Sequence, residues 1–252
     1  MLKIDHLTKI YENGFKALDN ISVEIPDGQF VAIIGLSGSG KSTLLRCINR
    51  LIDPTDGQIM WNGLDITAAT DDELRQIRRR IGMIFQQFNL VKRSSVLTNV
   101  LSGRLGYINP AFSLFNYFPR REKDRAMLAL ERVGIAARAN NRASALSGGQ
   151  QQRVGIARAL MQEPELMLAD EPVASLDPAT SHSVMKYLVS LNKEDGITIL
   201  CSLHFLSLAR TYADRVIALK DGKLEFDGLP VEIDDERFKM IYGEEAVQVE
   251  IN

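Results

Sequence analysis

The segment Gly35–Ser42, with the sequence GLSGSGKS, has the residue types and the spacing of a loop that binds phosphate groups. It follows the apolar run Phe30–Ile34 and precedes a stretch of helical character. Glycines let the backbone curl until several N–H groups point at one phosphate, and a helix N-terminus adds partial positive charge. Lys41 can reach the β- and γ-phosphates, and the Ser42 hydroxyl can bind Mg²⁺. We therefore predict a nucleoside triphosphate site, the alternative being a glycine turn that binds nothing.

Two acidic residues, Asp170 and Glu171, directly follow the apolar run Leu166–Ala169. In enzymes with such a loop, an aspartate at a strand end holds Mg²⁺, directly or through water. The next acid can orient the attacking water or accept its proton. Adjacent acids at a strand end can also be an ordinary polar cap. Because the glycine loop is in the same chain, we interpret this pair as catalytic.

Three more polar or aromatic residues stand where a nucleotide site would use them. Gln86 and His204 each follow an apolar run, and the carboxyl ends of parallel strands meet at one edge of a sheet. We expect both beside Asp170, although a solvated amide and a structural histidine are the plainer interpretations. Tyr11 precedes a turn; it either packs within a hairpin or stacks on a nucleobase.

A second anion-receptive segment is Leu146–Gln150, which leads into a predicted helix at Gln151–Met161. Ser-Gly-Gly at a helix start offers free backbone amides, as the glycine loop does. Taken alone, it could equally be a helix cap with a flexible lead-in. One phosphate does not need two such cradles in one chain. The pair of cradles indicates a site shared between two chains.

Composition sets broad limits. With 252 residues, 45% of them hydrophobic, the chain can bury a large core, and a net charge of −2 gives no reason to expect nucleic acid as the main partner. No apolar run reaches the ~20 residues that span a bilayer, and the first residues do not have the pattern of a secretory signal. Cys47 and Cys201 are expected to be small buried hydrophobes, and the histidines show no metal-ligand spacing.

The pattern predicts an α/β chain with a helical insertion at 89–157. Short apolar strands dominate on either side of it, whereas Arg120–Val133 within it has helical spacing. The insertion also contains a cluster of aromatic residues: Tyr107, Phe112, Phe115, Tyr117 and Phe118. Such a cluster can be a satellite core or a docking surface. We expect a docking surface.

Taken together, these motifs resemble those of the ATP-binding subunits of ABC transporters, over nearly the whole chain. The matching segments, in order, are Gly35–Ser42, Gln86, Leu146–Gln150, Asp170-Glu171, Ser175–Asp177 and His204. The resemblance implies an α/β fold: a P-loop NTPase (RecA-like) core with an N-terminal antiparallel β subdomain and an α-helical subdomain that carries Leu146–Gln150. One domain would span 1–246, with the core in 1–88 and 158–246, the helical subdomain in 89–157 and a tail at 247–252.

The resemblance also implies a role for each matching residue. Glu171 becomes the general base, His204 the γ-phosphate sensor, and Gln86 the link between Mg²⁺ and the membrane subunit. The residues that would bind ATP are Tyr11, at the adenine, and Gly35, Ser37, Gly38, Ser39, Gly40, Lys41, Ser42 and Thr43. Those that would bind the ATP of the opposite subunit are Ser147, Gly148, Gly149, Gln150 and Asp177. The Mg²⁺ ligands would be Ser42, Gln86 and Asp170.

A single ATPase domain without a membrane segment resembles bacterial importers, and four segments are most similar to the phosphonate importer ATPases: Leu101–Gly106, Val173–Asp177, Ser202–His204 and Ile241–Gly243. This implies ATP and Mg²⁺ as cofactors and hydrolysis in a head-to-tail dimer of two copies. It also implies integral-membrane permease subunits, an indirect partnership with a solute-binding protein, no nucleic acid, and a peripheral location on the cytoplasmic face of the inner membrane.

Three alternatives stay open. The same engine could import phosphate, phosphite, a polar amino acid or another small solute, because the cargo never touches this subunit. A soluble ABC ATPase acting on DNA or ribosomes would carry long coiled-coil insertions, zinc modules or a second ATPase domain, which the sequence does not show. A small-molecule kinase would need an acceptor pocket and a lid, and it would have no use for Leu146–Gln150.

Overall fold

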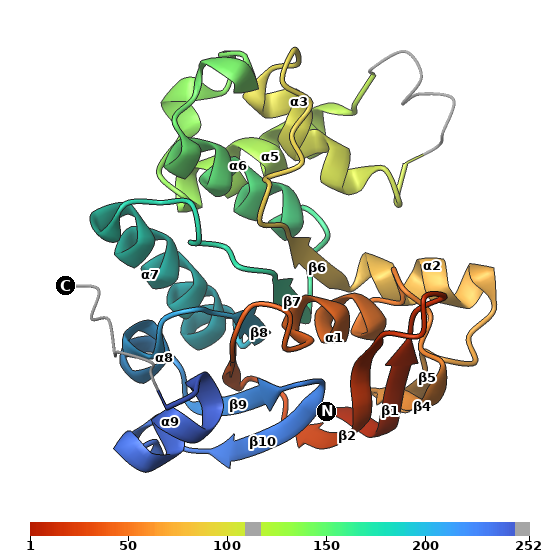
Figure 1. The fold of residues 1–252 in the computed structure, drawn as a ribbon. Helices are drawn as coiled ribbons and strands as arrows, with labels where there is room; N and C mark the ends of the chain where they lie inside the picture. The colour runs from red at the N-terminus through yellow and green to blue at the C-terminus, as the bar shows by residue number, and fades with distance from the viewer. Residues whose placement is uncertain (109–116, 245–252) are drawn as a thin grey trace.

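The computed structural model describes residues 1–108 and 117–244. Two β-sheets form the lower part of the molecule in Figure 1, and a group of helices lies above them. The α/β architecture expected from the sequence is confirmed. Within the described residues, no helix has the length and apolar character needed to cross a bilayer.

The larger sheet has six strands in the order β10-β9-β3-β8-β7-β6. All neighbouring strands pair in parallel except β9 and β10, which form the C-terminal hairpin. The strands are β3 (Phe30–Ile34), β6 (Ile81–Ile84), β7 (Leu166–Ala169), β8 (Thr198–Ser202), β9 (Arg215–Lys220) and β10 (Lys223–Gly228). Strands β3, β6, β7 and β8 are buried along their whole length. This explains their continuous apolar sequences, because both faces of a parallel sheet are covered.

The smaller sheet is antiparallel, with the order β2-β1-β4-β5. Its strands are β1 (Leu2–Ile10), β2 (Lys16–Ile25), β4 (Asp56–Trp61) and β5 (Leu64–Asp65). Buried and exposed residues alternate along β2, as expected where one face of a sheet meets water. The buried face, which includes Ile4 and Trp61, joins one core with Val31 and Ile33 of β3. The smaller sheet therefore supports the strand that leads into the glycine loop.

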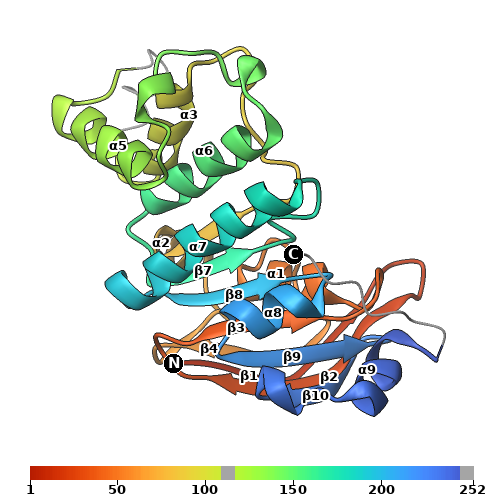
Figure 2. The same cartoon turned by 90° about the vertical axis from the view of Figure 1, so that its left-hand side faces the viewer.

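Helices cover both faces of the larger sheet. The α-helices are α1 (Lys41–Ile48), α2 (Asp71–Arg79), α3 (Val96–Leu101), α5 (Arg120–Arg132), α6 (Gly148–Leu160), α7 (Pro178–Asp195), α8 (Leu206–Tyr212) and α9 (Asp235–Tyr242). Short 3₁₀ turns are η1 (Ser102–Arg104), η2 (Ala136–Arg138), η3 (Ala143–Ala145) and η4 (Pro230–Glu232). Helix α1 packs on the side of the smaller sheet, and α7 and α8 pack on the opposite face (Figure 2). Helices α3, α5 and α6 pack together above the sheet.

The expectation that the aromatic cluster is a docking surface is wrong for Phe118. Its side chain is 5% exposed and belongs to the core with Val100 and Ala126. The Tyr107 hydroxyl lies 2.9 and 2.8 Å from the backbone oxygens of Arg79 and Gln162, either of which can accept its proton, while Tyr107 and Tyr117 are 38% and 59% exposed. Phe112 and Phe115 lie outside the described residues. An apolar aromatic run fills a core as readily as it covers a surface, so its composition could not separate the two.

The two cysteines are buried, as the sequence predicted. Burial raises the pKa of the Cys47 thiol to about 12. Burial also raises the pKa of Cys201. Both thiols therefore stay protonated at neutral pH and pack as small hydrophobic side chains.

Candidate active site

The glycine loop is fixed by contacts that only glycine allows. Gly35 has φ 141° and Gly40 has φ 107°, values that L-residues rarely adopt. A Cβ atom on Gly35 would lie 2.2 Å from the carbonyl oxygen of Leu219, at the end of β9. A Cβ atom on Gly40 would lie 2.5 Å from the carbonyl oxygen of Ala17. The loop is thus held between the two sheets, by close contacts with β9 on one side and β2 on the other.

The loop presents polar groups that lack partners within the chain. Helix α1 begins after Gly40, and no side chain of the described residues caps its N-terminus. The hydroxyl of Ser39 is buried, and the described part of the chain gives it no hydrogen-bond partner. Ser37 and Gly38 form the exposed crest of the loop. Free first-turn amides and a buried unpaired hydroxyl are the groups that an anion at a helix N-terminus would satisfy.

Lys41 places its ammonium group inside the loop. The Nζ atom donates to the backbone oxygens of Gly35 and Leu36 at 2.8 and 2.9 Å. Burial lowers the pKa of Lys41, and the charges of Glu171 and Asp170 oppose that shift. The ammonium therefore lies within the electrostatic reach of both carboxylates. Phosphate oxygens in the loop would replace the two carbonyls as its partners.

The Asp170 carboxylate is at the centre of a polar cluster, with 3% of its side chain exposed. One oxygen accepts from the hydroxyls of Ser42 and Ser202 at 2.7 and 3.2 Å. The other accepts from the guanidinium of Arg46 at 3.3 Å. Hydroxyl and carboxylate oxygens are the donors that Mg²⁺ prefers, so Ser42 and Asp170 fit the cation. The guanidinium supplies positive charge to the same carboxylate.

Arg46 and Ser202 received no role from the sequence. Arg46 stands four residues after Ser42 and thus on the same face of α1, which is the signal that could have found it. Ser202 is the last residue of β8, and Asp170 directly follows the neighbouring strand β7, so both lie at the same edge of the sheet. Besides its contact with Asp170, its hydroxyl accepts from the Glu171 amide at 2.8 Å.

Glu171 and His204 are in direct contact. His204 Nε2 lies 2.7 Å from Glu171 Oε1, and 12% of the glutamate side chain is exposed. Glu171 has φ 49°, the left-handed conformation that costs energy outside glycine. The bond from its amide to Ser202 holds it there. Residues with strained backbone conformations cluster at functional sites. Here the strained residue is the one whose carboxylate contacts His204.

Tyr11 lies beside the first turn of α1. Its hydroxyl is 3.2 Å from the Thr43 hydroxyl. Its ring is nearly parallel to that of Phe15, with centroids 6.5 Å apart. The Tyr11 hydroxyl is therefore beside the residue that directly follows the glycine loop.

Gln86 is less closely tied to this cluster. It lies two residues beyond β6, at the edge where the Asp170 amide donates to the Ile84 oxygen at 2.9 Å. Gln86 lines a groove together with Gln151 and Ser175. No hydrogen bond within the described ranges joins its side chain to Ser42 or Asp170. The structure therefore places Gln86 at the same edge of the sheet as Asp170, as expected, but not within the polar cluster around Asp170.

The second cradle is built differently. Ser147 caps α6: its hydroxyl accepts from the Gln150 amide at 3.4 Å, and the Gln150 side chain accepts from the Ser147 amide at 3.1 Å. Gly149 packs against Thr180 near the start of α7, and Asp177 caps that helix. The bond from Thr180 lowers the pKa of Asp177. Figure 1 shows α6 among the upper helices and α1 among the strands, so one chain does not bring the two cradles together.

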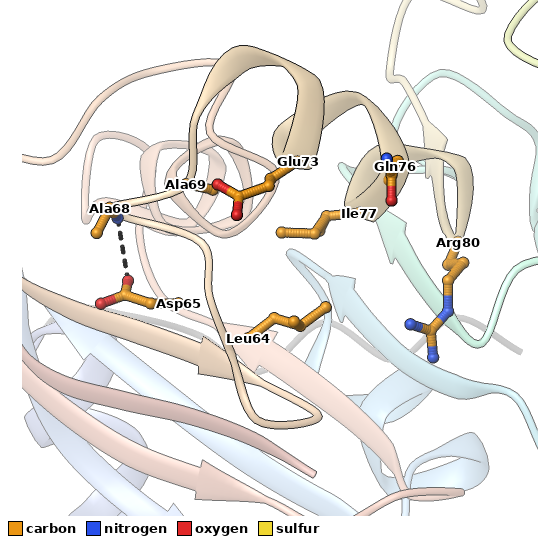
Figure 3. Close-up of a pocket in the computed structure, with 8 residues that line it drawn as sticks. All are labelled: Leu64, Asp65, Ala68, Ala69, Glu73, Gln76, Ile77 and Arg80. Carbon is orange, nitrogen blue, oxygen red and sulfur yellow. Dashed lines mark hydrogen bonds between the residues drawn. The ribbon is translucent and has the colours of Figure 1, made fainter.

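A separate pocket of about 390 Å³ lies between α2 and the β4–β5 hairpin. Figure 3 shows Leu64 and Ile77 facing each other across it, with Arg80 at one end. Its Asp65 carboxylate accepts from the Ala68 amide at 3.1 Å, and Arg80 is paired with Glu165 at 2.6 Å. Its charged groups are thus already engaged within the chain, and the pocket does not include the glycine loop.

Comparisons with known proteins agree with this geometry. The family model described as ABC transporter matches residues 18–174. The chain is similar to the phosphonates import ATP-binding protein PhnC 1 of Halalkalibacterium halodurans, with 57% identity over 96% of this chain and 95% of that protein. It is 55% identical to the phosphonates import ATP-binding protein PhnC of Bdellovibrio bacteriovorus, over 100% of this chain and 97% of that one.

Solved structures give the same result. An ATP-binding cassette, solved as a dimer in a post-hydrolysis state with ADP and Pi, is similar to the chain with a TM-score of 0.80. Sequence identity to it is 39%, over 91% of this chain and 99% of that one. A component of an ABC transporter complex from Clostridium perfringens gives a TM-score of 0.81 at 32% identity, over 95% of this chain and 92% of that one.

Proposed function

The chain belongs to the ABC transporter family as an ATP-binding protein, and we propose that it is the ATP-hydrolysing subunit of a bacterial phosphonate importer. The choice of phosphonate as the transported solute is supported by the 57% identity, over 96% of the chain, to a protein named for phosphonate import. The chemistry rests on this chain's own residues: the uncapped glycine loop, the Asp170 cluster and the Glu171–His204 pair.

We assign the hydrolytic roles as follows. The loop amides and Lys41 bind the phosphates of ATP, and Tyr11 stacks on the adenine. Ser42 and Asp170 would hold Mg²⁺, which when bound would neutralise charge on the phosphates, and Gln86, from the same edge of the sheet, would be a further ligand. Glu171 orients the attacking water and accepts its proton, while His204 contacts the γ-phosphate. The distance of 2.7 Å between Glu171 and His204 supports these last two roles.

We further propose that each ATP lies between two copies arranged head to tail. Ser147, Gly148, Gly149 and Gln150 would reach the γ-phosphate held by the other copy, with Asp177 beside them. The separation of the two cradles within one chain supports this arrangement. Each site then needs both chains, and a lone chain should hydrolyse ATP slowly.

The remaining partners follow from the importer role. Permease subunits would bind this chain at the cytoplasmic face of the inner membrane, through the helical part at 89–157, where Gln86 is adjacent. A solute-binding protein would act through the permease. Membrane association is therefore peripheral.

The test is ATP hydrolysis by the chain assembled with its permease in liposomes. Binding protein is supplied with methylphosphonate, phosphite or phosphate in turn. We expect the phosphonate to stimulate hydrolysis selectively. Equal or greater stimulation by another oxyanion would leave the importer ATPase role intact and would overturn the assignment of phosphonate as the transported solute. If no permease assembly occurs and hydrolysis is unresponsive to any solute, the chain would belong with the soluble ATPases of the same family.

A further inference from the structure

Strand β8 ends in a serine that is buried among the groups of the candidate active site. Ser202 is the last residue of the strand and is 0% exposed. On one side it pairs with Ile33 of β3, the strand that leads into the glycine loop. On the other side β8 runs parallel to β7, which leads directly into Asp170 and Glu171 (Figure 2). Ser202 therefore stands at the edge of the sheet where three neighbouring strands end.

The hydroxyl of Ser202 links the two acids. It accepts from the Glu171 amide at 2.8 Å, and it lies 3.2 Å from Asp170 Oδ1, to which it donates. The carbonyl oxygen of Ala169, at 3.5 Å, is the more distant alternative acceptor. The same oxygen of Asp170 accepts from the Ser42 hydroxyl at 2.7 Å. A chain of hydrogen bonds thus runs from Ser42 in the glycine loop to the backbone of Glu171.

Glu171 is tied to the end of β8 at two points that differ in kind. Its carboxylate contacts His204 Nε2 at 2.7 Å, whereas its amide bonds to Ser202. In the proposed function, the carboxylate turns to the attacking water and His204 to the γ-phosphate, so the first contact would be given up. The amide bond does not involve the reacting carboxylate and can persist. It can therefore keep the left-handed backbone of Glu171, with φ 49°, in place throughout the reaction.

We propose that Ser202 is a positioning residue for ATP hydrolysis, whose hydroxyl holds the backbone of Glu171 and so keeps its carboxylate aimed at the attacking water. The inference rests on the proposed function, which makes Glu171 the general base. Without the hydroxyl, the Glu171 amide loses its acceptor, and the strained conformation loses the bond that holds it. A base that is less well oriented accepts a proton more slowly. Asp170 keeps its shorter bond to Ser42, so binding of Mg-ATP should change little.

The experiment compares Ser202→Ala with wild type in the full chain, and Thr198→Val is the matched control. Thr198 begins the same strand and is 3% exposed, and its hydroxyl accepts from the Gly28 amide at 2.9 Å. Both substitutions therefore remove a buried hydroxyl from β8 and leave a backbone amide without its acceptor. Only the amide that loses Ser202 belongs to the site.

We expect Ser202→Ala to lower kcat for Mg-ATP about three- to tenfold, the loss that one missing hydrogen bond causes. Thr198→Val should leave kcat unchanged. In both variants, the affinity for a fluorescent ATP analogue with Mg²⁺ should change less than about twofold. Ser202→Cys keeps the shape of the side chain but offers only a weak acceptor. It is a second variant in which kcat should fall, and it serves if alanine impairs folding.

Two further measurements separate positioning from general destabilisation. In a Glu171→Gln background, Ser202→Ala should lower the remaining rate of single-turnover hydrolysis no further, because residues that act through one another are not additive. Hydrogen exchange of the Glu171 amide should become faster in folded Ser202→Ala and stay unchanged in Thr198→Val.

Four results would overturn the inference. They are an unchanged kcat in both Ser202 variants, an equal loss of kcat in Thr198→Val, an unchanged exchange rate of the Glu171 amide in Ser202→Ala, and a full additive loss in the Glu171→Gln background. If wild type itself does not hydrolyse ATP, the proposed function fails instead.

Discussion

Helices α1 and α6 both start next to glycine and serine residues, yet their N-termini are closed to different degrees. At α6, the side chains of Ser147 and Gln150 form a reciprocal cap. At α1, Gly40 occupies the cap position, and no side chain among the described residues closes the helix. The α1 start is also buried between two sheets, whereas Ser147 is exposed. One N-terminus is stable as it stands, and the other is left for a ligand.

This difference supports the proposal that one phosphate site is divided between two chains. Lys41, Asp170 and Glu171 lie around the open terminus of α1. In the proposed function, these are the groups that would act on a phosphate bound there. The capped terminus keeps its shape without a ligand and can be offered to a second copy. Removing a group at α1 should therefore change ATP chemistry, and removing one at α6 should change stability and assembly.

The largest effect should come from Glu171→Gln. The amide keeps the size of the side chain but cannot accept a proton, so hydrolysis should fall about 10²- to 10⁴-fold. ATP affinity should stay within a few fold of wild type, because the loop and Lys41 are intact. Steady-state hydrolysis and equilibrium binding measure the two quantities. Loss of both together would mean that Glu171 serves binding rather than the water.

Lys41→Ala should come next. Alanine cannot make the hydrogen bonds that the ammonium group would make to the phosphates. ATP affinity should therefore drop about 10- to 100-fold, the cost of removing a charge-assisted bond. Titration with a fluorescent ATP analogue gives the value. The exposed Lys186 on α7 offers a control, and its change to Ala should leave affinity unaltered. Equal losses in the two variants would point to net charge instead of the loop.

What the sequence could predict is uneven across these regions. The positions of the glycine loop, Asp170 and Glu171 directly after strands β3 and β7 were predictable, because each follows an apolar run in the sequence, whereas their roles stay predictions. Phe118 was not, since an aromatic residue suits a core or a surface equally well. Ser202 lies far from Ser42 in the chain, and only the packing of the sheet and α1 brings both hydroxyls to one oxygen of Asp170. Arg46 carried a local signal, its helical spacing from Ser42, but no pattern named Asp170 as its partner.

At α6, Ser147→Ala should cost about 1 kcal/mol of unfolding free energy, since it removes a helix cap. For a chain of this size that lowers Tm by about 2–4 °C. Ser37→Ala, on the exposed crest of the glycine loop, should leave Tm unchanged. Thermal unfolding followed by circular dichroism compares the two. A larger loss for Ser37→Ala would contradict the view that the α1 terminus is not stabilised by its own side chains.

The smallest effect concerns another capped helix. Glu73 accepts from Thr70 at the start of α2, and those bonds lower the pKa of Glu73. Its contribution to stability is therefore full above the unfolded pKa and is lost as pH falls through the lower folded value. Glu73→Gln keeps the cap without the charge. The Tm difference between wild type and this variant should shrink from pH 6 to pH 3, and a difference that grows would reverse the sign of the argument.

The central claim is that one ATP needs the open terminus of one chain and the capped terminus of another. Light scattering after gel filtration, applied to Glu171→Gln with saturating Mg-ATP, tests it most directly. The mass should double with ATP and return to that of a single chain with ADP. Adding Ser147→Arg to the same variant should abolish the doubling while ATP still binds. A Glu171→Gln chain that stays single at saturating Mg-ATP, or a doubling that survives Ser147→Arg, would contradict the claim.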